Sequence, residues 1–256
     1  MNEMMVNQTL DKLAVMHLRA MAAELRRQNE LPAMSELSFE ERFGMLVDAQ
    51  WLSRNNAKLK RLLKLAWLTE PNACLADIDY DPQRKLDRAQ IARLSSLDWI
   101  RSGQDLLVTG ATGTGKSYIV SAFGREACCS GISVRTYRVG RLLTNLEIGR
   151  GDGSYNKLMD DLKKPDLLIL DDFGLEPLEP DASRDFYEVI YERHGARSTA
   201  VTSQLPVNMW HTMFVDKTIA EAVMDRLANG SCRIDAKGPS RRGRPASTPS
   251  ESLVTV

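Results

Sequence analysis

Eight consecutive residues near the middle of the chain have the composition of a phosphate-binding loop. Residues 110–117 read Gly-Ala-Thr-Gly-Thr-Gly-Lys-Ser. In such a loop, backbone N–H groups surround anionic oxygens, and the N-terminus of the following helix adds partial positive charge. The lysine reaches the β- and γ-phosphates of a nucleotide, and the final hydroxyl binds Mg²⁺. The octapeptide therefore predicts a site for ATP or GTP.

The residues on either side of the loop support this interpretation. Residues 105–109 have the short, branched, apolar character of a buried strand, and residues 118–129 can form a helix. A glycine-rich turn with an incidental lysine is the alternative, and the strand–loop–helix setting argues against it. The residues that we expect to hold the nucleotide are Gly110, Ala111, Thr112, Gly113, Thr114, Gly115, Lys116 and Ser117.

Two adjacent aspartates follow a second apolar run, at residues 167–173. A strand ending here would place Asp171 beside the loop, where its carboxylate and the Ser117 hydroxyl can hold Mg²⁺. Asp172 stands where many such ATPases carry a water-activating glutamate, and its side chain is one methylene shorter. We expect Lys116, Asp171 and Asp172 to act in hydrolysis, while a site that binds nucleotide with negligible turnover remains an alternative.

Further polar residues suit the same chemistry. Ser203 and Gln204 end an apolar run and could hydrogen-bond the attacking water or the γ-phosphate, although simple strand capping is equally consistent with each. Arg226 ends a helical stretch and could neutralise charge on the transferred phosphoryl group, including in the site of a neighbouring subunit. A surface salt bridge is the alternative for Arg226.

The order of elements predicts an α/β fold. Short apolar runs alternate with helical stretches, which indicates a parallel five-stranded sheet flanked by helices. The expected strands are residues 105–109, 133–137, 167–171, 198–203 and 232–235. Before the sheet, the sequence predicts helices at residues 9–29, 38–50 and 51–67. We expect an N-terminal helical region at 1–99, an ATPase domain at 100–236 and a basic, disordered tail at 237–256.

Five basic residues are concentrated in the third N-terminal helix. Between residues 49 and 69 there is no acidic residue. At helical spacing, Arg54, Lys58 and Arg61 share one face, which could follow the phosphates of a DNA duplex in a sequence-tolerant, salt-sensitive way. An ordinary solvated helix face is the alternative. The expected DNA contacts are Arg54, Lys58, Lys60, Arg61 and Lys64.

Composition limits the other classes of partner. The chain has 34 basic and 34 acidic residues, so any nucleic acid must be contacted by a local patch. No apolar run is long enough to span a membrane, and no secretory signal precedes the first helix. The four cysteines form no CxxC pair. These features predict a cytoplasmic protein with no membrane partner.

The ordered motifs resemble the IstB family of insertion-sequence ATP-binding proteins, which belongs to the AAA+ superfamily and is related to the helicase loader DnaC. The resemblance spans nearly the whole chain. Beyond the phosphate-binding loop and the Asp-Asp pair, it is carried by Arg-Gly-Asp-Gly-Ser-Tyr at 150–155, Ser-Thr-Ala-Val-Thr-Ser-Gln-Leu-Pro at 198–206, and residues 227–242. The basic segment at 54–64 lies where the family carries a helix rich in arginine and lysine.

The resemblance implies an ATP-bound homo-oligomer that assembles on double-stranded DNA, deforms it and presents it to an IstA-type transposase. It implies ATP and Mg²⁺ as cofactors, a sensor-1 role for Ser203 and Gln204, and a trans-acting arginine finger at Arg226. Arg242 lies near the family's sensor-2 arginine. Residues 237–240 read Lys-Gly-Pro-Ser where the family usually has Lys-Gly-Glu-Ser, so the choice between Arg241 and Arg242 stays open.

Two other functions are also consistent with the sequence. A DnaC-like loader would grip a replicative helicase, but nothing before residue 100 resembles a metal-binding helicase-docking module. A nucleotide-gated scaffold would bind ATP without appreciable turnover because Asp172 is short. Target-site preference, subunit number and the particular transposase do not follow from the sequence.

Overall fold

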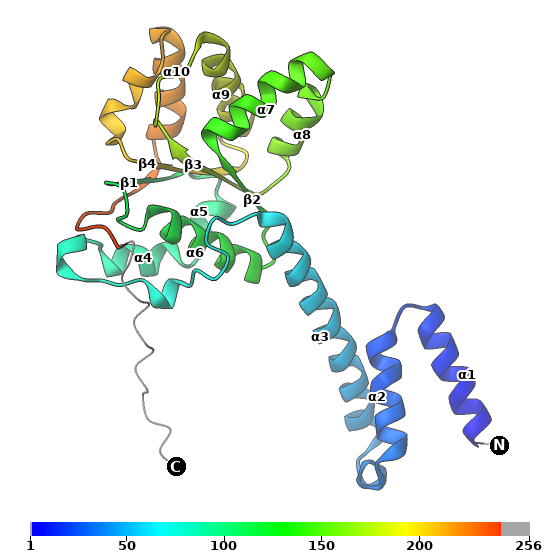
Figure 1. Ribbon diagram of the computed structural model, residues 1–256. Helices are drawn as coiled ribbons and strands as arrows, with labels where there is room; N and C mark the ends of the chain where they lie inside the picture. Colours follow the sequence, from blue (N-terminus) through cyan, green and yellow to red (C-terminus); the bar gives the residue numbers. More distant parts are fainter. Residues whose placement is uncertain (1, 242–256) are drawn as a thin grey trace. The chain divides into compact units, whose positions relative to one another are not determined.

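The computed structural model describes residues 2–241 of the 256-residue chain (Figure 1). The chain divides into two compact units, Met1–Arg61 and Leu62–Val256. The three-part division that the sequence suggests stays a prediction about functional organisation. The Arg242 assignment and residues 242–256 of the expected tail lie outside the described residues.

The first unit is helical, but its helix boundaries differ from the predicted ones. It contains α1 (Asn2–Val15), α2 (Arg19–Glu30), the short helix η1 (Pro32–Glu36) and most of α3 (Phe39–Ala66). The single helix predicted at 9–29 is wrong, because His17 adopts a left-handed φ of 58° and the Leu18 amide donates back to the Leu13 carbonyl at 2.8 Å. This geometry ends a helix.

The two helices predicted at 38–50 and 51–67 form one continuous helix, α3. Residues 45–66, which include the predicted boundary between Gln50 and Trp51, contain no glycine or proline, so the backbone hydrogen bonds continue across that boundary. The N-terminus of α3 has a capping box, in which the Glu41 amide donates to the Ser38 hydroxyl at 3.2 Å and the Ser38 amide donates to the Glu41 carboxylate at 2.9 Å. Buried Gln50 accepts from the Ala20 and Met21 amides and so caps α2.

The second unit contains the predicted five-stranded sheet, and the α/β fold class is confirmed. The strand order is β2-β3-β4-β1-β5, and all four pairings are parallel. The strands are β1 (Leu106–Thr109), β2 (Val134–Arg138), β3 (Leu167–Phe173), β4 (Ser198–Ser203) and β5 (Cys232–Asp235). Residues of β1 and β4 are buried throughout, as expected for central strands covered on both faces.

Helices cover both faces of the sheet. In Figure 1, α4, α5 and α6 lie on one face, and α7, α8, α9 and α10 lie on the other. Their bounds are α4 (Arg88–Leu94), α5 (Asp98–Arg101), α6 (Lys116–Cys129), α7 (Val139–Asp152), α8 (Tyr155–Lys163), α9 (Pro180–Arg193) and α10 (Lys217–Ala228). Three short helices, η2 (Leu75–Asp77), η3 (Pro82–Arg84) and η4 (Val207–Met213), lie in the connections. Within residues 2–241, the length and apolarity needed to cross a membrane are found together in no helix.

Parallel pairing brings the carboxyl ends of the strands to one edge of the sheet, where ligands bind in α/β folds of this kind. The loop that starts at Gly110 follows β1, and Asp171 and Asp172 lie near the end of β3. Arg138 ends β2 and Ser203 ends β4. The topology therefore gathers the predicted nucleotide-binding residues from segments far apart in the sequence.

A buried polar network joins elements at the opposite edge of the sheet. Arg193, only 1% exposed, donates to the carbonyls of Leu162, Pro165 and Ser198 and to the Thr199 hydroxyl, at 2.5–3.2 Å. Asp105 accepts from the Thr199 amide at 2.7 Å. Burial raises the pKa of Asp105 to about 7, although the Thr199 amide and the charge of Arg193 act against the shift.

Candidate nucleotide site

The predicted phosphate-binding loop leaves β1 and leads into α6, which begins at Lys116. Gly113 and Gly115 have left-handed φ values of 81° and 87°, which residues with a side chain rarely adopt. Both also lie against neighbours, because an added Cβ would approach the Ser240 hydroxyl at Gly113 and the Arg84 guanidinium at Gly115. These glycines therefore permit both the curvature of the loop and its close packing.

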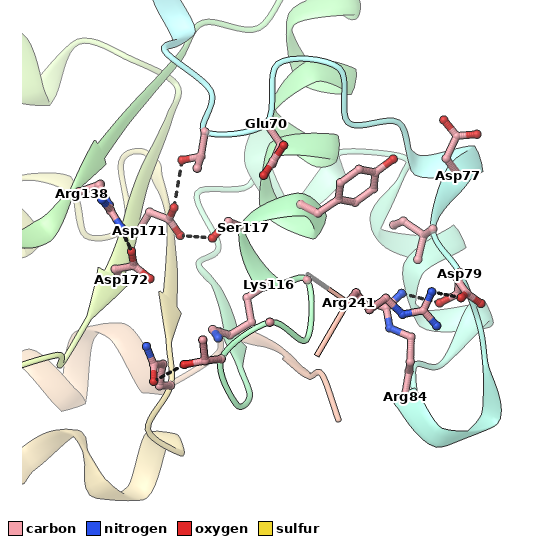
Figure 2. Close-up of a pocket in the computed structure, with 17 residues that line it drawn as sticks. Glu70, Asp77, Asp79, Arg84, Lys116, Ser117, Arg138, Asp171, Asp172 and Arg241 are labelled. Carbon is pink, nitrogen blue, oxygen red and sulfur yellow. Dashed lines mark hydrogen bonds and ion pairs between the residues drawn. The ribbon is translucent and has the colours of Figure 1, made fainter. Parts of the chain in front are cut away.

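A cavity of about 550 Å³ lies beside the loop, and it collects residues from the loop, the Asp-Asp pair, the end of β4 and the described part of the arginine pair (Figure 2). Its lining comes from the loop, from the ends of β2, β3 and β4, and from the segment between α3 and α4. The lining residues are Thr69, Glu70, Asp77, Ile78, Asp79, Arg84, Thr112, Gly113, Gly115, Lys116, Ser117, Tyr118, Arg138, Asp171, Asp172, Gln204 and Arg241.

Asp171 is the centre of the hydrogen bonding in this cavity. Asp171 is only 1% exposed, and three hydroxyl groups donate hydrogen bonds to its carboxylate. Ser117 and Thr202 donate to Oδ1 at 3.0 and 2.5 Å, and Thr69 donates to Oδ2 at 3.0 Å. Three hydrogen bonds from different elements fix the orientation of this carboxylate.

The donor set suits Mg²⁺. The Ser117 hydroxyl and the Asp171 carboxylate are hard oxygen ligands that already lie within hydrogen-bond distance of each other. Among the described residues no group of three or more His, Cys, Asp or Glu could hold a metal by itself. Mg²⁺ at nucleotide sites is commonly held by one or two protein oxygens together with substrate phosphates, which matches this arrangement.

Lys116 occupies the position that the loop motif assigns to the phosphate-contacting lysine. The residue is 6% exposed, and its Nζ donates to the Ala111 carbonyl at 2.9 Å, across the loop. The ammonium group is therefore folded back over the cradle that the backbone amides form. A phosphate in the cradle would compete with the carbonyl for this ammonium group, because a hydrogen bond from an ammonium to a charged phosphate is stronger than one to a neutral carbonyl.

Asp172 differs from Asp171 in its partner and its backbone. Its carboxylate forms an ion pair with Arg138, whose Nη2 and Nε lie 2.6 and 3.2 Å from Oδ2. The hydrogen bond to Asp172 is the largest cause of a raised pKa of Arg138. The residue also has a left-handed φ of 61°, and its amide donates to the Thr202 hydroxyl at 2.9 Å. Thr202 thus orients both aspartates.

Gln204 and Ser203 have different environments, although the sequence suggested the same role for both. Gln204 lines the cavity, and its Oε1 accepts a hydrogen bond from Thr112 of the loop at 2.7 Å. Ser203 is fully buried, donates to the Phe173 carbonyl at 2.7 Å, and is not among the lining residues. Its hydroxyl also accepts from the Leu205 amide, which is strand capping.

Arg226 does not line the cavity of its own chain. It lies over two tyrosines of α9, with its guanidinium carbon 5.4 and 5.2 Å from the ring centroids of Tyr187 and Tyr191. It also donates to the Ala222 carbonyl at 2.8 Å. The role of Arg226 in a neighbouring subunit's site stays a prediction.

Arg241, the described member of the predicted arginine pair, does line the cavity. Its amide donates to the Gly113 carbonyl at 2.9 Å. Its guanidinium forms an ion pair with Asp79 (Figure 2) and a second one with Asp81. Burial by itself would raise the pKa of Asp79. The hydrogen bonds from the Asp81 amide and from Arg241 together outweigh this effect, so the pKa lies below its ordinary value. Residues 237–241 therefore contact the ATPase unit instead of extending away from it.

Several lining residues were missed by sequence reasoning. Thr69, Glu70, Asp79 and Arg84 precede the loop by roughly 25 to 50 positions, in a segment with no recognisable nucleotide motif. Buried Arg84 donates to the carbonyl of Thr114 in the loop at 2.9 Å and to that of Asp79. Arg138 had a usable signal, because the carboxyl ends of parallel strands share one edge of the sheet.

The predicted DNA-contacting residues lie on α3. All five are exposed, and none makes an ion pair or a side-chain hydrogen bond with any residue in the described range 2–241. Leu62 and Ala66 of the same helix are buried, at 8% and 0% exposed. The basic side chains are thus available to an external partner, and their binding to DNA stays a prediction.

Comparison with known proteins now identifies the family. A family model described as IstB-like ATP binding protein matches residues 11–248. The chain belongs to this family. An insertion sequence ATP-binding protein of Sinorhizobium fredii is 41% identical over 93% of this chain and 97% of its own length. An ATP-binding protein of insertion sequence IS1162 from Pseudomonas fluorescens is 47% identical over 79% of this chain and 88% of its own.

Solved structures show where else this IstB-like fold occurs. The structure of DnaI has a TM-score of 0.59 at 23% identity and covers 71% of this chain and 100% of its own. The DnaC helicase loader has a TM-score of 0.53 at 19% identity, covering 65% of this chain and 97% of its own. These likenesses confirm the AAA+ fold. ATP binding follows from the family itself.

Proposed function

We propose that this IstB-family protein is an ATPase that assembles on double-stranded DNA and presents it to the transposase of an insertion sequence. The hydrogen bond between Ser117 and Asp171 carries the first part of this proposal, because it joins the phosphate-binding loop to the acidic end of β3. The exposed basic residues of α3 support the second part. The names of the insertion sequence relatives support the transposition context.

The residues of the cavity divide the work of hydrolysis. Lys116 and the loop amides would bind and orient the phosphates, and Ser117 and Asp171 would hold Mg²⁺, which supplies charge neutralisation when bound. Asp172 would orient the attacking water and accept its proton. Because Arg138 now holds that carboxylate, Asp172 has to exchange this partner for water when it acts.

The basic residues of α3 would contact DNA phosphates without reading the base sequence. Arg54, Lys58 and Arg61 occupy one helical face at the spacing i, i+4 and i+7, and counterion release would make their binding salt-dependent. Deforming DNA costs several kcal/mol, roughly 1–6 for a bend of 40–90°. One small helix does not readily offset this cost, so we expect several protomers to act together, with Arg226 completing the site of a neighbour.

ATP-dependent assembly tests the scheme directly. Sedimentation of the full chain with a DNA duplex should show large complexes with ATP and smaller ones with ADP. Lys116→Ala should lose this difference, since the loop then lacks its charged phosphate contact. Lys157→Ala removes an exposed lysine from α8 and should behave like the wild type. If Lys116→Ala assembles with unchanged ATP dependence, the scheme is wrong.

A replicative helicase loader is the second candidate, and the likeness to DnaI and DnaC favours it. Both likenesses are below 25% identity and concern the fold. Co-expression separates the two functions: the chain should co-purify with the transposase encoded beside its gene and not with the host's replicative helicase. The reverse result would favour loading.

A further inference from the structure

Consecutive residues from the end of α3 onwards pack against the sheet and helices of the ATPase fold. Ala66, the last residue of the helix, is completely buried, and Trp67 has a left-handed φ of 50° that ends the helix abruptly. The Trp67 ring receives the Arg135 guanidinium at 4.2 Å and lies edge-on to Tyr137 at 5.8 Å, so it is anchored on β2. We call residues 66–70 the coupling segment.

The next residues of the coupling segment reach α6 and the nucleotide cavity. Leu68 packs so closely on α6 that an added Cβ at Gly124 would come within 2.8 Å of it. The Glu70 amide donates to the Ser121 hydroxyl of α6 at 3.2 Å. Between them, Thr69 donates to Asp171 Oδ2 at 3.0 Å. The segment therefore holds the carboxylate proposed to bind Mg²⁺.

Thr69 bonds a different oxygen of the Asp171 carboxylate from the other two hydroxyl groups. Ser117 and Thr202 both donate to Oδ1, whereas Thr69 is the hydroxyl on Oδ2. Ser117 and Thr202 come from α6 and β4, inside the ATPase fold. Thr69 comes from a segment whose preceding helix carries the basic residues. Removing or shifting Thr69 would leave Oδ2 without this donor and free the carboxylate to rotate.

We propose that Thr69 is a positioning residue that makes the ATP site sensitive to DNA held by α3. This inference rests on the proposed function, since it needs both DNA binding at Arg54–Lys64 of α3 and hydrolysis at Asp171. Only three positions separate Thr69 from the end of α3, so a change in α3 on DNA binding reaches Asp171 through the coupling segment. If DNA binding changes the affinity for ATP, thermodynamic linkage requires ATP to change the affinity for DNA by the same factor.

A matched pair of substitutions isolates the hydroxyl. Thr69→Val keeps the shape of the side chain and removes the donor, whereas Thr69→Ser keeps the donor and removes a methyl group. Two ratios are measured on the full chain. One is phosphate release with a DNA duplex divided by release without it. The other is DNA affinity with a non-hydrolysable ATP analogue divided by affinity with ADP, from fluorescence anisotropy.

Both ratios should fall to below about a third of the wild-type values in Thr69→Val, and Thr69→Ser should retain them. A hydrogen bond to a charged group contributes enough for changes of this size, since tenfold corresponds to about 1.4 kcal/mol. DNA affinity with ADP should stay at the wild-type value. Ratios cancel any uniform loss of activity, so a purely structural role for Thr69 would leave them unchanged.

Trp67→Ala supplies a second test, because Trp67 does not line the cavity. Loss of its contacts with Arg135 and Tyr137 should lower both ratios, and Trp67→Phe, which keeps a ring there, should lower them less. If the wild type shows both ratios above one and Thr69→Val keeps them, this inference fails and the proposed function stands. If the wild type shows neither ratio above one, the inference and the proposed function fail together.

Discussion

The charges of the sheet-containing unit and the charges of α3 are organised in opposite ways. Asp171 and Arg193 are each only 1% exposed and are surrounded by hydrogen-bond partners from several strands and helices. The five basic residues of α3 are exposed and make no ion pair within the described part of the chain. The first arrangement fixes a charge in one position, and the second leaves it free to meet a partner.

The physical reasons differ accordingly. A buried charge is costly unless nearby groups satisfy it, so its position and its partners are selected together. An exposed charge costs little, and its interaction with phosphates depends on charge density and salt more than on exact geometry. Removing one buried partner should therefore have large local effects, while exposed charges should act additively and weakly.

The largest expected effect is on stability. Arg193→Met removes four hydrogen bonds and leaves Asp105 buried without its cationic neighbour, so the free energy of unfolding should fall by about 3–5 kcal/mol. Urea denaturation measures this. Arg184→Met, in an exposed ion pair with Asp181, is the control and should cost less than about 1 kcal/mol. Equal losses would erase the contrast between buried and exposed charge.

The next effect concerns catalysis. Asp172→Ala should lower DNA-stimulated phosphate release roughly a hundredfold, because the proposed proton acceptor is lost. Affinity for ATP should change little, since Asp171, the proposed metal ligand, is unchanged. Asp160→Ala, an exposed aspartate of α8, is the control. Equal rates for the wild type and Asp172→Ala would support a nucleotide-gated scaffold in place of an ATPase.

A smaller effect is expected at the basic face of α3. Neutralising Arg54, Lys58 and Arg61 with glutamine should weaken DNA binding at least about tenfold for every sequence and reduce the salt slope by roughly one per lost phosphate contact. Unfolding should be unchanged within about 0.5 kcal/mol. A control with the same charge change neutralises Arg101, Lys164 and Arg184, which are exposed and already paired with acidic neighbours. An unchanged salt slope in the α3 variant would contradict the DNA assignment.

The last expected effect is a pH dependence. Burial raises the pKa of Asp105 to about 7 from an ordinary value of 3.8. The folded state therefore binds more protons between these values, and this group's contribution to stability falls as pH rises from about 4 to 7. Asp105→Asn keeps an acceptor for the Thr199 amide and cannot ionise. Relative to the wild type, its unfolding free energy should increase across this pH range, and a constant difference would contradict the assignment.

The sequence predicted the sheet well because each strand is a local pattern with a local cause. Runs such as residues 167–170 are apolar throughout, as is typical of a parallel strand buried on both faces. Helix boundaries were less predictable in the first unit. The helix ends near His17 because this residue adopts a left-handed conformation, and no glycine or proline there indicates this in the sequence. The helix α3 is continuous because no proline interrupts it.

The candidate site was predicted in part, because only some of its residues belong to local sequence patterns. Lys116 and Ser117 belong to a contiguous motif, and Asp171 and Asp172 end a recognisable strand. Ser203 was grouped with Gln204, yet its hydroxyl bonds a backbone carbonyl of β3, which depends on how two neighbouring strands pair. Sequence spacing alone does not show which way a side chain at a strand end will point.

By itself, the sequence determined a phosphate-binding loop, an acidic strand end, a parallel sheet and a basic helix, because each depends on neighbouring residues. Only the tertiary structure decided the partners of those residues. Thr69 bonds Asp171 from 102 positions away, Arg138 holds Asp172 across two strands, and Arg241 lies on the loop far from both. Such contacts follow from chain topology, which brings distant segments to one edge of the sheet and which no local pattern encodes.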